Sequence, residues 1–374
     1  MNPAVRKLPL HLVLSTDASV ADILRLGMGP YFKKTLAAYS HEFAVDLYSA
    51  DARSFSVELG VDHRPLLAGL PAALPRPLEV LIYYRRLVRA ADRMSGLVRV
   101  LSSNLAVLPE MKRRGGGRGK FLVDLRYDWA RTTQAYYGGA KKLFASRMQS
   151  RCLLAADLVI ATTPLLASVA TRGYGRRAIV VPNPVDRAMF RPAPNRRPTI
   201  LYAGRLHPGK GVGLLIDAFG RIARERDGVE LLILGTGEEH ESLERKAERE
   251  VPGRRVRFLG SRPQDEVAQH LGSALVLVLP SLVTEGNPKI VLEALASGTP
   301  IVATRVPGNT DLIEDGRQGL LVPPGDVNAL YRALSRILED EALRASLGRE
   351  GLRASRRYDA ERVLRNQCLS LIHI

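Results

Sequence analysis

Short apolar runs alternate with longer amphipathic segments along the whole chain. Runs of about four to eight apolar residues are typical of strands buried in a parallel sheet, and the longer segments repeat apolar residues with the period of a helix. The pattern predicts strands over residues 10–16, 44–49, 98–102, 121–125, 158–161, 178–181, 199–203, 231–234, 256–259, 275–279, 300–303 and 319–322. Strands that alternate with helices, such as those predicted over 212–226, 239–249 and 265–272, indicate an α/β fold.

A segment rich in proline and basic residues, 182–198, separates the two halves of this pattern. A chain of 374 residues is long enough for two domains, and such a segment is typical of a linker between them. We therefore expect an N-terminal Rossmann-like domain over 1–182, a linker over 183–198, a C-terminal Rossmann-like domain over 199–355 and a tail over 356–374. Two doubly wound domains that face each other place their ligand in the cleft, at the carboxyl ends of the strands.

The positive charge of the chain is concentrated in its first half. Residues 1–198 hold 31 Lys and Arg against 14 Asp and Glu, whereas residues 199–374 hold 24 of each, and the net charge is +17. This asymmetry indicates an anionic partner, which is a nucleic acid, an anionic membrane or a phosphorylated substrate. A solvated surface in an arginine-rich chain, with 45 Arg and 10 Lys, is the alternative.

Two segments of the first half, 78–94 and 140–157, combine apolar and basic residues at helical spacing. A basic amphipathic helix is able to lie on an anionic lipid surface. A core helix with a basic outer face gives the same sequence pattern, so both interpretations stand.

The cysteines and the apolar runs indicate the compartment. Cys152 and Cys368 are too few for a disulfide framework and lack the spacing of metal ligands. The first apolar run ends before Asp17, too early for a signal-peptide core, and no apolar run reaches about 18 residues. These features predict a cytoplasmic protein without a membrane span, peripheral on the inner face of the cell membrane if the basic half binds lipid.

The first candidate binding loop is GRLHPGKG, residues 204–211, which follows a predicted strand and precedes a predicted helix. Arg205 and Lys210 flank a tight turn of proline and glycine. Two cationic side chains beside the amides of a helix N-terminus form an anion site. A solvated surface loop is the alternative interpretation.

The second candidate loop begins TEGNPKIVLEALASG, residues 284–298. Asn287 suits an N-cap and Pro288 suits the first helical position, so the pattern predicts a helix over 288–297. The amides at the start of that helix favour a phosphate. Gly286 has no Cβ, which lets a ligand approach the backbone closely.

Two glutamates lie on either side of this turn. Glu285 precedes the predicted helix, and Glu293 lies about one and a half turns inside it. Carboxylates beside a diphosphate are useful when they accept hydrogen bonds from hydroxyl groups, and a nucleotide sugar carries hydroxyls at both ends. Arg205 and Lys210 would then neutralise the diphosphate between them. For Glu293, a solvent-facing helix position is the alternative.

Five phrases follow one another in the second half: GRLHPGKG, LILGTGEEHESL, VRFLG, LPSLVTEGNPKIVLEALASGTPIVAT and GLLVPPGD. In this order and spacing they resemble the donor half of GT-B glycosyltransferases, and the nearest group is the retaining family 4, or glycosyltransferase group 1, type. The resemblance covers residues 180 to about 326, and VVPNPVDRAMF is similar to the phrase that joins the two domains in that family. It implies the GT-B fold, in which two Rossmann-like domains face each other across a cleft.

The resemblance also implies roles for single residues. It places Arg205 and Lys210 on the diphosphate, where with Glu285 they are catalytic. It places Glu285 on the donor sugar as well, and Glu293 on the ribose. The other residues that it places at the donor are Gly204, Gly235, Gly237, Gly286, Asn287, Pro288, Lys289 and Ile290.

The same half of the chain argues against two cofactor classes. Gly235 and Gly237 follow a predicted strand, but the third glycine of a dinucleotide fingerprint is replaced by His240. No Asp-x-Asp pair of the metal-chelating kind occurs, so we expect no required divalent metal, because Arg205, Lys210 and a helix terminus are able to stabilise the leaving diphosphate. We expect no cofactor, and a UDP- or GDP-sugar as the donor substrate.

The first half resembles the family only in outline. A glycine pair after the first strand is interrupted by Met28, and no histidine follows the strand VRVLS. VDLRYDW, residues 123–129, is similar to an Arg-Asp phrase of some lipopolysaccharide and capsule transferases. Asp128 or Asp124 could therefore orient or deprotonate an acceptor hydroxyl, and Arg126 could bind an acceptor phosphate. An ion pair within this loop is the alternative.

The resemblance implies a retaining glycosyltransferase that moves a hexose-type sugar from a nucleotide sugar to a hydroxyl of a glycan or a lipid-linked acceptor, such as a polyprenyl diphosphate or glycolipid. Synthesis of cell-surface polysaccharide or glycolipid is the implied setting. Another enzyme on the same fold, such as a nucleotide-sugar epimerase or a phosphorylase, is the first alternative. A basic nucleic-acid-binding protein is the second, but it leaves the glutamates unexplained and needs aromatic stacking residues, which make up 6% of the chain. We therefore expect no nucleic acid partner.

The tail, 356–374, is expected to begin the helix with which members of this family usually cross back onto the first domain. Its last residues, LSLIHI, match the translated end of a common sequencing adapter. We therefore expect a crossing helix that is cut short.

Overall fold

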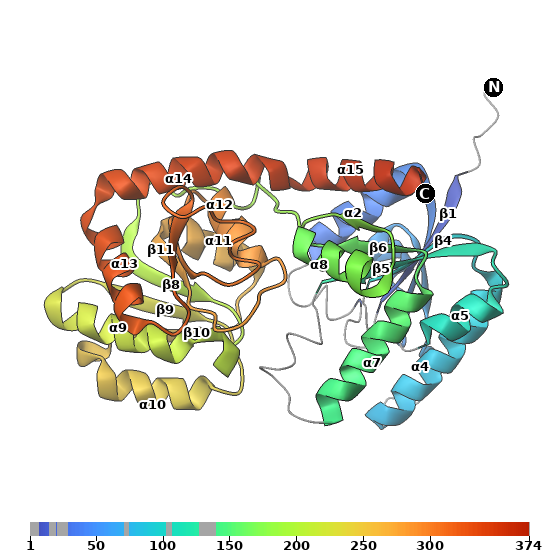
Figure 1. The fold of residues 1–374 in the computed structure, drawn as a ribbon, viewed down its shortest axis with the longest axis horizontal. Helices are drawn as coiled ribbons and strands as arrows, with labels where there is room; N and C mark the ends of the chain where they lie inside the picture. The colour runs from blue at the N-terminus through green and yellow to red at the C-terminus, as the bar shows by residue number, and fades with distance from the viewer. Residues whose placement is uncertain are drawn as a thin grey trace. The chain divides into compact units, whose positions relative to one another are not determined.

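The computed structural model describes residues 7–14, 20, 29–70, 75–101, 107–126 and 140–373. The chain divides into two compact units, each of which is described by itself. Unit 1 comprises Met1–Val181 together with Leu364–Ile374, and unit 2 comprises Pro182–Val363. Each unit is built on a parallel sheet with helices on both faces (Figure 1).

The sheet of unit 1 has seven parallel strands among the described residues, in the order β3-β2-β1-β4-β5-β6-β7. They are β1 (Leu8–Val13), β2 (Phe43–Ser49), β3 (Asp62–Pro65), β4 (Gly96–Val100), β5 (Gly119–Leu125), β6 (Leu158–Ala161) and β7 (Ala178–Val180). The hydrophobic pattern predicts all of them except β3. That edge strand, DHRP, escapes prediction because it carries no apolar run.

Helices cover both faces of this sheet, because successive side chains of a strand point to opposite sides. One core is closed by α4 (Arg76–Ala90), α5 (Leu108–Arg114), α7 (Ala140–Ala155) and α8 (Pro164–Ser168). The opposite core is closed by α2 (Gly29–Glu42) and by the end of α15 (Ala360–Ile372). Figure 1 shows α4, α5 and α7 below this sheet and α2 above it. Shorter elements are α3 (Ser56–Leu59), a 3-10 turn (Ala91–Arg93) and a π turn (Val169–Gly173).

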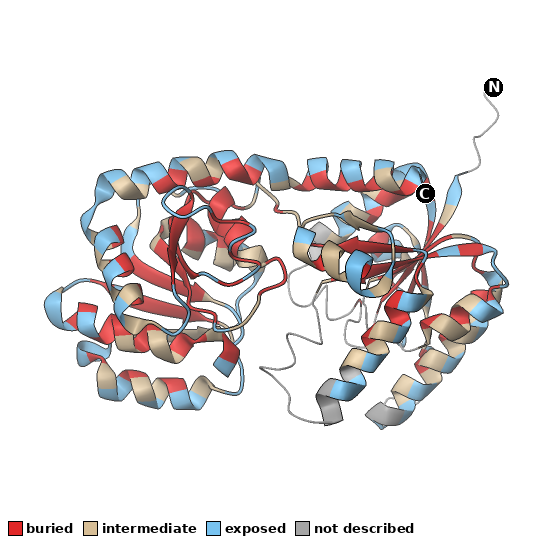
Figure 2. Ribbon diagram, in the orientation of Figure 1, coloured by how far each residue is buried: buried red, intermediate tan, exposed pale blue. Residues whose placement is uncertain are grey.

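The sheet of unit 2 has six parallel strands among the described residues, in the order β10-β9-β8-β11-β12-β13. They are β8 (Arg197–Ala203), β9 (Glu230–Leu234), β10 (Val256–Gly260), β11 (Ala274–Leu279), β12 (Ile301–Thr304) and β13 (Gly319–Val322). All of them lie where the hydrophobic pattern predicts strands. Strands buried on both faces carry continuous apolar runs, which makes them easy to recognise. Figure 2 shows these strands as largely buried, except the edge strand β10.

The helices of unit 2 pack on both faces of this sheet. They are α9 (Val212–Glu225), α10 (His240–Glu250), α11 (Gln264–Ser273), α12 (Lys289–Ala296), α13 (Val327–Glu339) and α14 (Glu341–Ser355), with 3-10 turns at Pro208–Lys210, Pro252–Arg254 and Arg356–Tyr358. The strand order reverses between β8 and β11, which are neighbours in the sheet although β9 and β10 follow β8 in the chain. In doubly wound sheets ligands bind at such a switch point, outside the carboxyl ends of the strands.

The predicted linker, 183–198, is part of unit 2 rather than a free connection. Val185 forms an isolated bridge with Asp359 and is buried. Phe190 is buried in the core on the α12 face of the sheet. The proline-rich composition therefore marks an irregular segment rather than a free linker. It packs on unit 2 because it carries apolar side chains between its polar ones.

The helix α15 begins in unit 2, and its residues from Leu364 onward belong to unit 1. Cys368 and Leu371 are buried in the core on the α2 face of unit 1. Leu371 lies within the terminal LSLIHI segment, so part of that segment is packed in this fold.

Three further features concern the described ranges of the chain. Within them, no helix is both long and apolar enough to span a membrane. Nor do those ranges contain a group of three or more His, Cys, Asp or Glu side chains placed to hold a metal ion. Cys152 and Cys368 are both buried and are not joined in a disulfide bond.

Candidate functional site

The loops that follow β8, β9 and β10 are joined by backbone hydrogen bonds. The N–H of Gly204 donates to the carbonyl of Leu234 at 2.9 Å, and the N–H of Gly235 donates to the carbonyl of Gly260 at 2.7 Å. The three loops therefore form one rigid edge at the carboxyl side of the sheet.

The close contact between the loops after β8 and β9 requires two glycines in the loop after β9. Gly235 has a φ of +130°, and a Cβ on it would lie 1.8 Å from the carbonyl oxygen of Gly204. A Cβ on Gly237 would lie 2.0 Å from the carbonyl oxygen of Leu206. Only glycine fits at either position, so their presence is explained by contact between two loops as well as by the predicted proximity to a nucleotide.

The loops after β8 and β11 are joined by an ion pair. Lys210 Nζ lies 2.7 and 2.8 Å from the two carboxylate oxygens of Glu285. Ser281 Oγ donates to the same carboxylate, and the N–H of Leu282 donates to the carbonyl of Gly209 at 2.8 Å. Glu285 is buried and Lys210 is partly exposed. The two strands that flank the switch point are thus connected by opposite charges just beyond their carboxyl ends.

Glu293 is buried on α12 beside these loops, so it is not the solvent-facing residue of the alternative interpretation. Its hydrogen-bond partner is Gln264 of α11, whose Nε2 donates to Oε1 at 3.4 Å. Burial raises the pKa of Glu293 to about 7, and Lys289 and Gln264 oppose this only in part. The carboxyl group is therefore shared between its neutral and ionised forms near neutral pH, and it can donate or accept a hydrogen bond.

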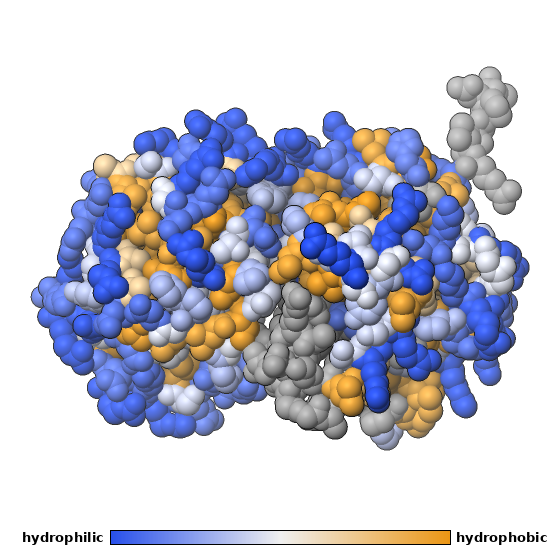
Figure 3. Space-filling view, in the orientation of Figure 1, coloured by the Kyte–Doolittle hydropathy of each residue, from blue (hydrophilic) through white to orange (hydrophobic). Residues whose placement is uncertain are grey.

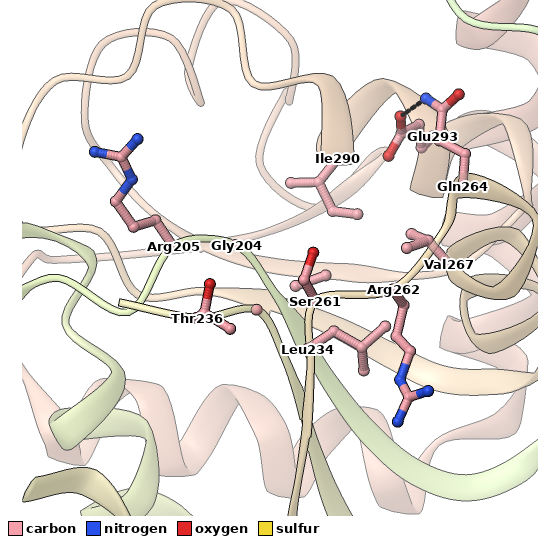
Figure 4. Close-up of a pocket in the computed structure, with 12 residues that line it drawn as sticks. Gly204, Arg205, Leu234, Thr236, Ser261, Arg262, Gln264, Val267, Ile290 and Glu293 are labelled. Atoms are coloured by element: carbon pink, nitrogen blue, oxygen red, sulfur yellow. Dashed lines mark hydrogen bonds between the residues drawn. The ribbon is translucent and has the colours of Figure 1, made fainter. Parts of the chain in front are cut away.

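A pocket of about 350 Å³ opens at this edge of unit 2. Figure 4 shows Arg205 at one end of the pocket, and Glu293 and Gln264 at the other. Its lining residues come from the ends of β8 and β9 and the loops after them, the loop after β10, and the N-terminal parts of α11 and α12: Ala203, Gly204, Arg205, Leu234, Gly235, Thr236, Ser261, Arg262, Gln264, Val267, Ile290 and Glu293.

The pocket joins some of the predicted site residues and leaves others outside. Five of them line it: Gly204, Arg205, Gly235, Ile290 and Glu293. The remainder are not among its lining residues and lie on the adjoining loops or at the start of α12: Lys210, Gly237, Glu285, Gly286, Asn287, Pro288 and Lys289. The candidate site thus consists of a pocket at Arg205 and Glu293 and a separate charged pair at Lys210 and Glu285.

Sequence reasoning missed several lining residues, among them Thr236, Ser261, Arg262 and Gln264. A signal for them was present, because each lies within a few residues of the end of β9 or β10. In the sheet β9 lies beside β8 and β10 lies beside β9, which brings these strand ends to the same edge as the loop after β8. Arg262 adds a second guanidinium to the pocket and lies 3.5 Å from Glu266.

The predicted N-cap at Asn287 is wrong. The helix α12 begins at Lys289 with Pro288 as its N-cap residue, and no side chain caps it. The Asn287 Oδ1 accepts instead from the backbone N–H of Asn183 at 2.9 Å, and the Asn183 side-chain amide donates to the carbonyl of Asn287 at 2.7 Å. Asn287 is held by the start of unit 2, and the first turn of α12 keeps its amides free of a capping side chain.

In unit 1, Asp124 is engaged in a buried ion pair. Arg99 donates to its two oxygens at 2.8 and 2.9 Å, and Arg126 lies 3.3 Å from one of them. Gln367 of α15 completes the cluster, with its carboxamide oxygen oriented to accept from Arg99. The alternative of an ion pair is therefore favoured over a role for Asp124 at an acceptor hydroxyl. Asp128 lies outside the described residues.

Residues 197–340 match the family model of glycosyl transferases group 1. This part of the chain is similar to group 1 glycosyltransferases. It lies within unit 2, which is called the group 1 domain below.

Relatives of known name match about half of the chain. The phosphatidyl-myo-inositol mannosyltransferase of Mycobacterium leprae (strain TN) is 34% identical over 207 residues, which are 54% of this chain and 54% of that protein. The lipopolysaccharide core biosynthesis glycosyltransferase LpsE of Rhizobium meliloti (strain 1021) is 34% identical over 204 residues, 52% of this chain and 58% of that protein. The chain spans about half the length of the curated relatives it matches.

Solved structures match nearly the whole chain. The sucrose-phosphate synthase of Thermosynechococcus elongatus has a TM-score of 0.79 at 21% identity, and the match covers 98% of both chains. Anabaena HepE in complex with UDP and glucose has a TM-score of 0.77 at 18% identity, covering 98% of this chain and all of that one. These likenesses confirm the predicted fold, which is GT-B with two doubly wound parallel sheets.

Proposed function

We propose that the protein is a retaining glycosyltransferase that transfers a hexose-type sugar from a UDP- or GDP-sugar to a hydroxyl of a glycan or lipid-linked acceptor. The observation that carries the proposal is the pocket at the switch point of the group 1 domain, which has Arg205 at one end and the buried Glu293 at the other. A cation and a hydroxyl-binding carboxyl group at opposite ends match the diphosphate and the ribose of a nucleotide.

Arg205 and Lys210 are the proposed ligands of the donor diphosphate. Arg205 is exposed at the pocket and offers a planar fork of N–H donors, which suits phosphate oxygens. Lys210 directs two N–H groups at Glu285, which leaves one for a phosphate oxygen. Glu285, neutralised by Lys210, is then able to accept a hydrogen bond from a sugar hydroxyl without repelling the diphosphate.

The reaction proposed is a front-face substitution. The bond from the anomeric carbon to the diphosphate oxygen breaks, and a bond from the acceptor oxygen forms on the same face of the sugar. The acceptor proton passes to an oxygen of the leaving diphosphate, so no side chain is needed as a nucleophile. The chain contributes fixed charges: Arg205, Lys210 and the uncapped amides of α12 stabilise the negative charge that develops on the diphosphate.

The comparisons support a nucleotide-sugar donor and a carbohydrate or lipid acceptor. HepE was solved with UDP and glucose, and the relatives named above are a phosphatidyl-myo-inositol mannosyltransferase and a lipopolysaccharide core glycosyltransferase. No required metal or cofactor is part of the proposal, because the guanidinium and ammonium groups supply the positive charge that the leaving diphosphate needs.

Thermal-shift titration with UDP, GDP and their sugars tests the donor half of the proposal. One nucleotide at a hundredfold excess over its Kd should stabilise the group 1 domain by about 2.7 kcal/mol. Product analysis by NMR then tests the reaction, because a retaining transferase gives a product with the anomeric configuration of the donor. An isomerised nucleotide sugar without acceptor would point to an epimerase instead, and a sugar phosphate would point to a phosphorylase.

A further inference from the structure

Two helices of unit 1, α4 and α7, both pack against α5 and carry similar rows of exposed side chains. On each helix an exposed apolar pair near the N-terminal end is followed by two exposed arginines at spacings of three or four residues, so each row lies on one helix face. The row on α4 is Leu78, Leu81, Arg85 and Arg89, and the row on α7 is Leu143, Phe144, Arg147 and Arg151. We call these eight residues the α4–α7 rows.

The opposite faces of the same helices are buried. Tyr83 and Leu87 of α4 and Cys152 and Leu153 of α7 enter one core on this side of the sheet. The rows therefore point away from the sheet, as the helical period requires. A helix that needs only to cover a core has no use for large apolar residues on its outer face, yet the four apolar members of the rows are 42%, 50%, 53% and 66% exposed.

The four arginines of the rows have no ion pair or hydrogen bond to another described residue. Arginines nearby do have them: Arg86 donates to two backbone carbonyls, Arg113 pairs with Glu110, and Arg114 pairs with Asp92. The charge of the rows is therefore not neutralised within the described part of the chain, and it is available to an external anion.

The apolar ends of both rows lie at one edge of unit 1. In a parallel sheet each crossover helix runs against its strands, so the first turns of α4 and α7 lie near the carboxyl edge. Figure 3 shows apolar side chains over the lower parts of these two helices, next to hydrophilic ones. This is also the edge where a doubly wound sheet binds its ligand.

We propose that the α4–α7 rows dock unit 1 on the surface of an anionic phospholipid bilayer. The leucines and the phenylalanine enter the boundary between headgroups and acyl chains, and the arginines contact lipid phosphates. Docking in this way brings the carboxyl edge of unit 1 to the membrane, where a lipid-linked acceptor resides. The proposal goes beyond the proposed reaction and does not depend on it, because lipid binding requires no donor.

The positive charge of the rows favours a bilayer over a second copy of the chain as the binding partner. A symmetric dimer through the rows would place the same four arginines of each copy against one another, and the rows hold no acidic residue to compensate. A bilayer that contains anionic lipid offers negative charge to the arginines of the rows and an apolar layer to their leucines and phenylalanine.

Vesicle flotation with the full chain tests the proposal. Vesicles of phosphatidylcholine alone are compared with vesicles that contain about 30 mol% phosphatidylglycerol, at low and high salt. The protein should float with the anionic vesicles at low salt, bind them less at high salt, and remain largely unbound with phosphatidylcholine. Failure of the unaltered protein to bind the anionic vesicles at low salt would overturn the proposal.

Three variants locate the binding surface. The first variant combines Arg85→Gln, Arg89→Gln, Arg147→Gln and Arg151→Gln. Its partition coefficient onto anionic vesicles should fall about fivefold for each arginine removed. Leu81→Ser with Phe144→Ser should also reduce binding, by removing the inserted groups. The matched control combines Val57→Ser, another exposed apolar residue, with Arg113→Gln and Arg114→Gln, and it should bind as the unaltered protein does.

Two further measurements separate the possible outcomes. Sedimentation at rising protein concentration detects a dimer, and a dimer lost in the Leu81→Ser, Phe144→Ser variant would overturn the proposal in favour of a second copy. Equal loss of vesicle binding in the control variant would overturn it as well. Thermal shift with UDP and GDP on the same variants should be unchanged, so failure of the proposed reaction is distinguishable from failure of membrane docking.

Discussion

Lys210 and Glu285 form an ion pair with Nζ 2.7 and 2.8 Å from the two carboxylate oxygens. They stand on the loops after β8 and β11, which are adjacent in the sheet and 75 residues apart in the chain. The resemblance predicts that both contact a nucleotide sugar, and the structure adds that they contact each other. The pair fixes the position of each side chain, which in the proposed reaction would lower the cost of ordering them around the donor.

The ion pair can be tested by removing its members one at a time and together. Lys210→Met leaves a buried carboxylate without its cation and should destabilise the group 1 domain by roughly 2–3 kcal/mol, below the range for fully buried pairs because Lys210 is partly exposed. The double variant Lys210→Met, Glu285→Gln should recover part of this loss. Urea unfolding of the four proteins measures the coupling.

In the same single and double variants, transferase activity should not recover as stability does. Because both groups contact the donor in the proposed reaction, each single variant and the double variant should lose donor turnover by about a hundredfold or more. A double variant that recovers stability and activity together would show that the pair serves the fold alone.

The raised pKa of Glu293 predicts a pH dependence of stability in the group 1 domain. The carboxyl pKa is 4.5 in the unfolded reference and about 7 in the fold, because of burial. Between these values the folded state holds a proton that the unfolded state has released, so stability falls as pH rises. The expected loss is roughly 3 kcal/mol across that window.

Glu293→Gln is the matched variant for this prediction, since it keeps the size and the neutral form of the side chain. Relative to the unaltered protein, it should gain stability at pH 8 and change little at pH 5. Hydrogen exchange of peptides from the group 1 domain measures this without interference from unit 1. The same slope in both proteins would assign the pH dependence to another group. Glu293→Ala, which removes the hydroxyl-binding group altogether, should cripple turnover.

Glycine substitutions test the contact between the loops after β8 and β9. Gly235→Ala forces a Cβ to within 1.8 Å of the Gly204 carbonyl oxygen and strains a φ of +130°, so it should cost about 2–4 kcal/mol and displace Arg205. Gly213→Ala on α9 is the control, because its Cβ meets its nearest neighbours at 3.9 Å and helix propensity should stabilise it by about 0.5–1 kcal/mol. Thermal unfolding and UDP or GDP affinity are the measurements, and a tolerated Gly235→Ala would contradict the assigned contact.

The His63 side chain should make the stability of unit 1 depend on pH in the opposite direction. Its Nδ1 accepts the backbone N–H of Phe55 at 2.8 Å, so the neutral ring carries its proton on Nε2 and donates to Ser49, which in turn donates to Asp51. Burial lowers the pKa of His63, and Asp51 and Glu58 oppose this only in part. Below about pH 6.5 the unfolded chain binds a proton that the fold resists, so unit 1 should lose stability as pH falls.

His63→Asn keeps an acceptor for the Phe55 N–H and cannot be protonated. It should flatten the acid limb of the stability profile of unit 1, followed by hydrogen exchange of its peptides between pH 5 and 7. An unchanged acid limb would assign that limb to another titrating group.

Much of the fold follows from patterns that are local in the chain. The apolar runs of β8 to β13 locate every strand of the group 1 domain, and all of these strands except the edge strand β10 are largely buried. The polar edge strand β3 of unit 1 gives no such signal. The basic amphipathic segments at α4 and α7 are also visible. Five ordered phrases, one of which holds the two glutamates, resemble group 1 glycosyltransferases, and the match of residues 197–340 to that family model agrees with this.

Other features depend on which strands become neighbours, and only the tertiary structure decides them. Through the family resemblance, the sequence predicts that Arg205, Lys210, Glu285 and Glu293 all serve the donor. It could not determine that Lys210 pairs with Glu285, or that burial keeps Glu293 partly protonated, because each depends on contacts between β8, β11 and α11 that lie far apart in the chain. For the same reason Asn287 looks like a helix cap in the sequence but is held by Asn183, a partner that only the packed fold supplies.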